Sequence, residues 1–159
     1  AMIHGYCIGG GLAVALTADL RIAADDAKFT IPAAKLGLGY RASGLGKLVQ
    51  LIRPSATKRI LFLADRFGAE EALTMGLINQ LVPKAELESV TDQWMQRICE
   101  NAPLTIRAAK AGIDEWAKPE SSQDFEAVNL LVDACFDSAD YREGVEAFIQ
   151  KRPPRFTGR

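Results

Sequence analysis

A run of three glycines near the start of the chain constrains the local structure more than any other feature. Gly9, Gly10 and Gly11 follow a short apolar stretch, residues 2–8, and precede an alanine-rich stretch, residues 12–18. Glycine lets a backbone approach a ligand closely and adopt angles that other residues avoid. The first N–H groups of a helix have no partner within it. We therefore expect a strand, a tight turn and a helix, with backbone N–H groups available to a negatively charged oxygen.

The glycine run does not match the common nucleotide-binding loops. It lacks both the Gly-x-Gly-x-x-Gly spacing and the Gly-Lys-Ser/Thr ending of a phosphate loop. The apolar residues on both sides do not fit a flexible linker. A tight strand-to-helix turn with no ligand is the alternative that the glycines alone leave open.

The composition indicates a globular chain with a sizeable core. It has 159 residues, of which 48% are hydrophobic and 25% charged, a typical balance for a folded domain. The net charge of −1 gives no reason to expect a nucleic acid or an anionic membrane as partner. We see no apolar run near the roughly 20 residues that span a bilayer and no leader peptide. Cys7, Cys99 and Cys135 lack metal-site spacing, so we expect reduced thiols in a cytoplasmic protein.

The hydrophobic periodicity predicts an α/β part, residues 1–82, followed by a helical part, residues 83–159. Strands are expected at residues 2–8, 20–24, 28–31 and 77–82. Helices are expected at residues 10–18, 45–52, 56–64, 69–75, 84–100, 103–117, 121–136 and 140–150. One helical turn is expected at residues 32–36, followed by a glycine-punctuated loop with Tyr40 and Arg41. The helical part has apolar stripes but no sheet, which is typical of an oligomerisation element.

Several motifs follow one another along the chain, at residues 3–19, 18–24, 29–32, 36–38, 69–83 and 142–152. In that order and spacing they closely resemble the enoyl-CoA hydratase/isomerase (crotonase) family. The resemblance implies an α/β fold, a crotonase-like β-β-α superhelix, of which this chain is the C-terminal part. It also implies a helical region that builds a trimer or a dimer of trimers. The implied substrate is an acyl-CoA thioester, with no further cofactor and no metal.

The resemblance assigns a role to the glycine run. Gly10 would donate its backbone N–H to the thioester carbonyl, as one of two donors of an oxyanion hole. A donor aimed at a developing enolate oxygen is worth about 10²–10³ in rate. The second donor would lie in the N-terminal part of the family's fold. Gly9, Gly11, Pro32 and Leu36 are expected to contribute to substrate and CoA binding.

Two positions at which the family carries proton-transferring glutamates hold alanines here. They are Ala13, the second residue after the glycines, and Ala33, which follows the proline. An alanine methyl cannot accept a proton, so the acid and base of a hydratase are absent. Asp19, Asp25 and Asp26 fall in helix-end and turn segments, where capping or solvation is the usual role, so we do not expect them to replace the glutamates.

Tyr40 offers a different chemistry. The Leu-Gly-x-x-Tyr sequence that ends at Tyr40 resembles the decarboxylating branch of the family, which acts on malonyl-type CoA thioesters. Departure of CO₂ forms the enolate without a base. Packing is the commoner role for a tyrosine in a loop. We expect His4 to be a packed or capped residue rather than a catalytic one. A non-catalytic subunit that binds CoA or forms oligomers is the remaining alternative to an acyl-CoA lyase or isomerase.

Phe148 and Lys151, near the end of the chain, match family positions that reach the CoA of a neighbouring subunit. The resemblance implies an aromatic face near the adenine and a cation near a phosphate. A packed phenylalanine beside a lysine on the helix surface is the alternative.

Overall fold

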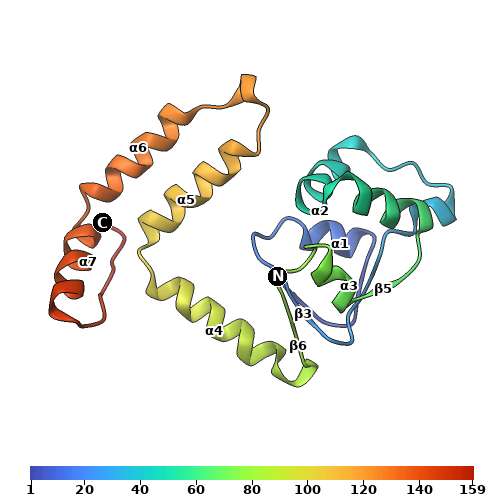
Figure 1. The fold of residues 1–159 in the computed structure, drawn as a ribbon, viewed down its shortest axis with the longest axis horizontal. Helices are drawn as coiled ribbons and strands as arrows, with labels where there is room; N and C mark the ends of the chain where they lie inside the picture. Colours follow the sequence, from blue (N-terminus) through green and yellow to red (C-terminus); the bar gives the residue numbers. More distant parts are fainter. The chain divides into compact units, whose positions relative to one another are not determined.

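The computed structural model describes residues 1–159, except for the side chain of Ser43. The chain divides into two compact units, Ala1–Asp92 and Gln93–Arg159. The first unit is α/β and the second is helical (Figure 1). The division falls later in the chain than the boundary at residues 82 and 83 that the sequence analysis placed there. The difference arises because helix α4 (Leu87–Glu100) begins in the first unit, where Leu87 is fully buried.

Two small three-stranded sheets form the centre of the first unit. One has the order β1 (Met2–Ile3), β3 (Ile22–Ala24), β6 (Gln80–Val82), and all its strands are parallel. The other has the order β2 (Tyr6–Ile8), β4 (Lys28–Thr30), β5 (Phe67–Gly68). Strand β4 pairs parallel with β2 and antiparallel with β5. The buried β3, with Ile22, Ala23 and Ala24 all inaccessible, fits a central parallel strand covered on both faces.

The single strand expected at residues 2–8 is two strands in different sheets. Gly5 separates them with a φ of +53°, a conformation that favours glycine. His4 also lies in this connection and is exposed, so of its two expected roles, packed or capped, packing in the interior does not hold. The side chain lies outside the strands because β1 ends at Ile3.

Five helical segments complete the first unit before α4 begins. They are α1 (Gly10–Ala15), a 3₁₀ turn η1 (Pro32–Leu36), α2 (Ala42–Leu63) and α3 (Ala69–Thr74), with a further 3₁₀ turn η2 (Lys84–Glu86) ahead of α4. Helix α2 combines the two helices predicted at residues 45–52 and 56–64 and begins earlier than either. Its kink lies at Arg53, with φ 68° and ψ 160°, because the residue before a proline is disfavoured in the helical region.

The core of the first unit is built around one aromatic pair. The rings of Phe29 and Phe67 stack with centroids 5.7 Å apart, so the middle and edge strands of the second sheet share one hydrophobic contact. Leu12 from α1 and Leu48 and Ile60 from α2 are fully buried in the same cluster. This packing explains why β5, which the sequence analysis did not predict, forms from only two residues.

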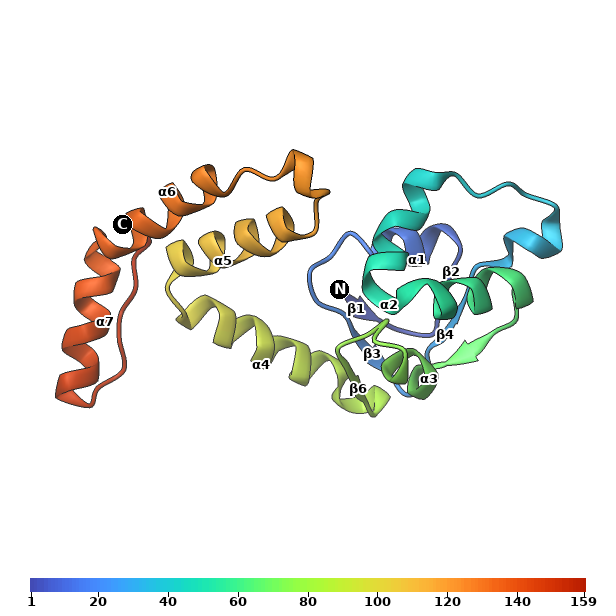
Figure 2. The same cartoon turned by 45° about the horizontal axis from the view of Figure 1, so that its top comes forward.

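The second unit consists of the end of α4 followed by α5 (Pro103–Trp116), α6 (Phe125–Phe136) and α7 (Ala139–Gln150), with a short 3₁₀ turn η3 (Glu120–Ser122) after α5 (Figure 2). Glu115 closes the α5–α6 hairpin, because its carboxylate accepts hydrogen bonds from Lys118 Nζ and Asp124 N, each at 2.6 Å. Asp124 and Ser138 then cap α6 and α7 through Ala127 N and Tyr141 N. In the described part of the chain, no helix is both long and apolar enough to cross a membrane.

Thr30, at the end of β4, provides a test of the core. Its Oγ1 is buried and has no hydrogen-bond partner among the described residues, and an unpaired buried hydroxyl destabilises a fold. Thr30→Val keeps the shape and removes the hydroxyl, so we expect the free energy of unfolding to rise by about 1 kcal/mol. Urea unfolding of the complete protein measures the change.

Thr57→Val is the matched control. Thr57 is equally buried, but its Oγ1 donates to Arg53 O at 2.9 Å, so the same substitution should lower the free energy of unfolding by about 1 kcal/mol. A change of the same sign in both variants would contradict the interpretation.

Candidate functional site

The glycine turn is held in place by the backbone of β4. Gly9 leads from β2 into α1 with φ 54° and ψ −112°, angles that require glycine. Its N–H donates to Thr30 O at 2.9 Å, and its carbonyl accepts the N–H of Ala13 at 3.0 Å. Pro32 Cδ lies 3.9 Å from the position that a Gly9 Cβ would occupy. The structure therefore brings Gly9 and Pro32 together, although they are far apart in the sequence.

The backbone at Gly10 and Gly11 is accessible to solvent. Both are exposed, and a Cβ added to either residue would meet nothing within 4 Å. They are the first two residues of α1, so their N–H groups have no acceptor within the helix. An external oxygen can approach this part of the backbone without displacing a side chain.

The two alanines at the glutamate positions differ in their surroundings. Ala13 is exposed on α1, whereas Ala33 is 6% exposed and belongs to the hydrophobic core. A carboxylate at position 13 would reach solvent. One at position 33 would start from an apolar environment, where the charged form is disfavoured.

The loop after η1 does not present its two candidate residues in the same way. Leu36 is 72% exposed, whereas Tyr40 is half-buried and packs against the core. Its ring lies against the first turns of α2: a Cβ on Gly44 would come within 2.9 Å of Tyr40 Cε1. Gly44 lies within α2, which begins at Ala42, and glycine at this position leaves room for the ring.

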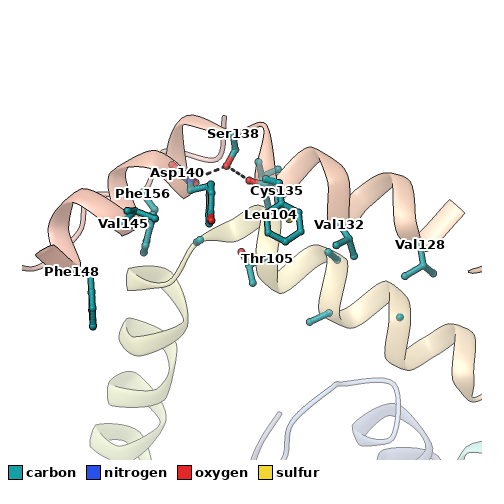
Figure 3. A pocket seen from close by; sticks show the side chains of 17 residues that line it. Leu104, Thr105, Val128, Val132, Cys135, Ser138, Asp140, Val145, Phe148 and Phe156 are labelled. Atoms are coloured by element: carbon teal, nitrogen blue, oxygen red, sulfur yellow. Dashed lines mark hydrogen bonds between the residues drawn. The ribbon is translucent and has the colours of Figure 1, made fainter. Parts of the chain in front are cut away.

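Phe148 and Lys151 lie in the second unit at the end of α7. Phe148 is 86% exposed, and Lys151 ends the helix in the left-handed conformation with φ 55°. Phe148 is one of the residues that line an open apolar cavity of about 750 Å³ between α5, α6, α7 and the C-terminal segment. Figure 3 shows the side chains that line it. Val128, Val132 and Val145 line the same cavity.

The C-terminal segment is fastened to α7 by two carboxylates. Asp140 accepts the N–H groups of Thr157 and Gly158, at 2.7 and 2.8 Å. Glu143 accepts two hydrogen bonds from the Arg152 guanidinium, at 2.6 and 2.9 Å, and the N–H of Arg155 at 2.8 Å. The Arg152 hydrogen bonds, with the Arg155 N–H and despite some desolvation, lower the pKa of Glu143 to about 2.

These contacts place Phe156 as a wall of the cavity, with its ring 3.5 Å from the position of a Gly144 Cβ. The sequence analysis assigned no role to the two carboxylates. The available signal was the spacing of Asp140 and Glu143, three residues apart in the first turns of a helix that basic residues follow.

Metal-ligand clusters and cysteine thiols are two further kinds of reactive group in proteins. No group of three or more His, Cys, Asp or Glu among them could hold a metal ion. Burial raises the pKa of the Cys7 thiol, which disfavours the nucleophilic thiolate. Cys135 is half-buried and its Sγ donates to Leu131 O.

Comparison with known proteins defines the class. The model of the enoyl-CoA hydratase/isomerase family matches residues 1–159. The chain belongs to this family, and the predicted resemblance is confirmed. A crystal structure of an enoyl-CoA hydratase/isomerase family protein from Hyphomonas neptunium has the same fold, with a TM-score of 0.91 and 38% identity over 100% of this chain and 60% of that one.

Two characterised relatives show the range of chemistry in the family. A crotonyl-CoA hydratase from Syntrophomonas wolfei is 34% identical over 98% of this chain and 60% of its own length. A methylmalonyl-CoA decarboxylase from Escherichia coli is 33% identical over 99% of this chain and 61% of its own. The chain thus spans about 60% of the length of these relatives.

Acid should loosen the C-terminal segment through Glu143. Its pKa is lowered from 4.5 to about 2, so its stabilising contribution is complete above pH 4.5 and is lost as the pH falls toward 2. We expect the urea midpoint of the wild-type protein to fall more steeply between pH 5 and pH 2.5 than that of Glu143→Gln. Glu146→Gln, on the same helix, where Glu146 accepts from Gln150, should retain the wild-type slope. Equal slopes for all three proteins would show that the contact contributes nothing.

Proposed function

We propose that the complete protein binds an acyl-CoA thioester and polarises its carbonyl through the backbone N–H of Gly10. The observation that carries the proposal is the glycine turn, in which Gly9 has the required positive φ and Gly10 leaves the backbone open. Membership of the enoyl-CoA hydratase/isomerase family and the CoA thioesters named for its relatives support it. An N–H aimed at an oxygen that gains negative charge stabilises the transition state more than the ground state.

Gly9, Gly11, Pro32 and Leu36 are proposed to line the substrate site. Pro32 stands beside the turn, within contact distance of Gly9. Leu36 is exposed and so is available to an acyl chain. No proton-transferring carboxylate stands at position 13 or position 33, so the proposed activity is that of a lyase or isomerase that does not depend on two glutamates.

Decarboxylation of a malonyl-type thioester is the second candidate. In this reaction the bond to the carboxylate carbon breaks, CO₂ leaves, and the electron pair forms an enolate whose oxygen the Gly10 N–H would stabilise. The enolate then takes a proton from solvent or from a side chain, for which we propose Tyr40. The two alanines favour this candidate, and a methylmalonyl-CoA decarboxylase is among the similar proteins. A non-catalytic CoA-binding subunit would retain the glycine turn but would convert neither an enoyl-CoA nor a malonyl-type thioester.

We further propose that Phe148 and Lys151 contact the CoA of a neighbouring subunit in a trimer or a dimer of trimers. Both residues are exposed, and Phe148 offers a free aromatic face. The helical unit exposes several other large apolar side chains, among them Ile113, Trp116 and Ile149, each above 70%. These exposed apolar side chains are available to a partner subunit.

Crotonyl-CoA hydration by the wild-type protein should be about 10²–10⁴-fold slower than that by a two-glutamate hydratase, because the acid and base are absent. Ala13→Glu should fold normally, since position 13 is exposed, whereas Ala33→Glu should lower the free energy of unfolding by about 2 kcal/mol. Hydration should rise only in the double variant. Parallel assays with methylmalonyl-CoA distinguish a lyase from a non-catalytic protein. Rapid hydration of crotonyl-CoA by the wild-type protein would refute the two-carboxylate interpretation.

Substitution by alanine should affect ligand binding at Gly10 and stability at Gly9. Gly10→Ala meets no neighbour in the structure, so the fold should be retained while acyl-CoA binding weakens at least tenfold, because the methyl obstructs the ligand. Gly9→Ala forces a positive φ on alanine, which should destabilise the fold by about 1 kcal/mol or more. Circular dichroism and calorimetric titration with butyryl-CoA measure the two effects. Unchanged binding by Gly10→Ala would argue that the glycines form a turn and nothing else.

A further inference from the structure

Arg21 is a buried cation outside the site described above. It lies one residue before β3 and is 4% exposed. Its Nε donates to Leu77 O at 2.8 Å and its Nη1 to Ala18 O at 2.6 Å. Its backbone N–H donates to Asn79 Oδ1, and its carbonyl accepts the N–H of Asn79, both at 2.8 Å. Burying a guanidinium costs free energy, so the hydrogen bonds of Arg21 must offset that cost in the folded state.

The two carbonyls that the guanidinium binds belong to the turns that follow two helices. Ala18 lies three residues after the last residue of α1, and its N–H donates to Ala15 O. Leu77 lies three residues after the last residue of α3, and its N–H donates to Ala72 O. The guanidinium supplies a donor to each carbonyl from two different nitrogens. It therefore joins the turn after α1 to the turn after α3.

Helix α1 depends on such contacts for its direction. It has six residues, about 9 Å of helix, and a helix of that length is not stable alone. Leu12 and Ala15 bury one side of it in the core. Its start is tied by the Gly9 N–H to Thr30 O, and its end by Arg21 to Ala18 O. Loosening the second tie lets the helix pivot about the first, and Gly10 lies next to that pivot.

We propose that Arg21 is a positioning residue that sets the direction of the Gly10 N–H by holding the far end of α1 against the residues after α3. The inference rests on the proposed role of Gly10. It predicts that a change at Arg21 alters the polarisation of the bound thioester more than the affinity for CoA.

The test compares Arg21→Lys with the wild type in the complete protein. A lysine ammonium has all its donors on one nitrogen, so it cannot reproduce the two directions of the guanidinium fork. The measurement is the infrared stretch of the thioester carbonyl in bound butyryl-CoA labelled with ¹³C at that carbon. The wild type should shift the band to lower wavenumber than in free butyryl-CoA. Arg21→Lys should lose at least half of that shift, with the Kd for butyryl-CoA changed less than fivefold.

Arg59→Lys is the matched control. Arg59 is a partly buried arginine of the same unit that pairs with Asp65 and Glu71 and lies over the Phe67 ring. The variant should lower the thermal midpoint and leave the carbonyl band where it is in the wild type. A band unchanged in Arg21→Lys, with a lowered thermal midpoint, would show that Arg21 is structural only.

Two further outcomes are decisive. Absence of any band shift in the wild type would refute the role of Gly10 itself, a failure distinct from that of Arg21. Arg21→Gln serves as a second variant if Arg21→Lys does not fold. Failure of both to fold would overturn the proposal, because Arg21 would then be required for folding and not for the direction of one N–H.

Discussion

The hydrogen bond from the Gly9 N–H to Thr30 O holds together the parts of the first unit that matter for function. The bond closes the turn at a position whose backbone angles only glycine adopts easily. Pro32 lies against this position, at the start of α1. The parallel pairing of β2 with β4 continues directly into this bond. The glycines are therefore part of the sheet's hydrogen-bonding pattern as well as the entrance to a helix.

The periodic parts of the fold could be predicted, and the parts fixed by long-range packing could not. Helices α4 to α7 follow from apolar spacing over many residues. Strand β5 is two residues long and forms because Phe67 stacks on Phe29, a contact 38 residues away along the chain. The break within α2 was predicted from Pro54, because the residue before a proline is disfavoured in the helical region, and Arg53 has non-helical angles there.

The candidate site shows the same division. The glycine turn itself could be predicted, because glycine encodes a backbone conformation, whereas its contact with Pro32 is set by the pairing of β2 with β4. The different environments of Ala13 and Ala33 could not be read from two identical letters. The contacts of Arg21 were equally hidden, since its acceptors are backbone carbonyls, which every residue possesses. Side-chain chemistry is visible in a sequence, whereas the partner of a side chain is set by the fold.

The contact between Tyr40 and Gly44 couples the size of one residue to the orientation of the other. The ring of Tyr40 lies 2.9 Å from the position that a Cβ on residue 44 would occupy, so a side chain at position 44 requires the ring to shift. Glycine at position 44 therefore lets the ring of residue 40 pack against the start of α2. The orientation of a residue in the loop is thus set by the size of a residue in the following helix.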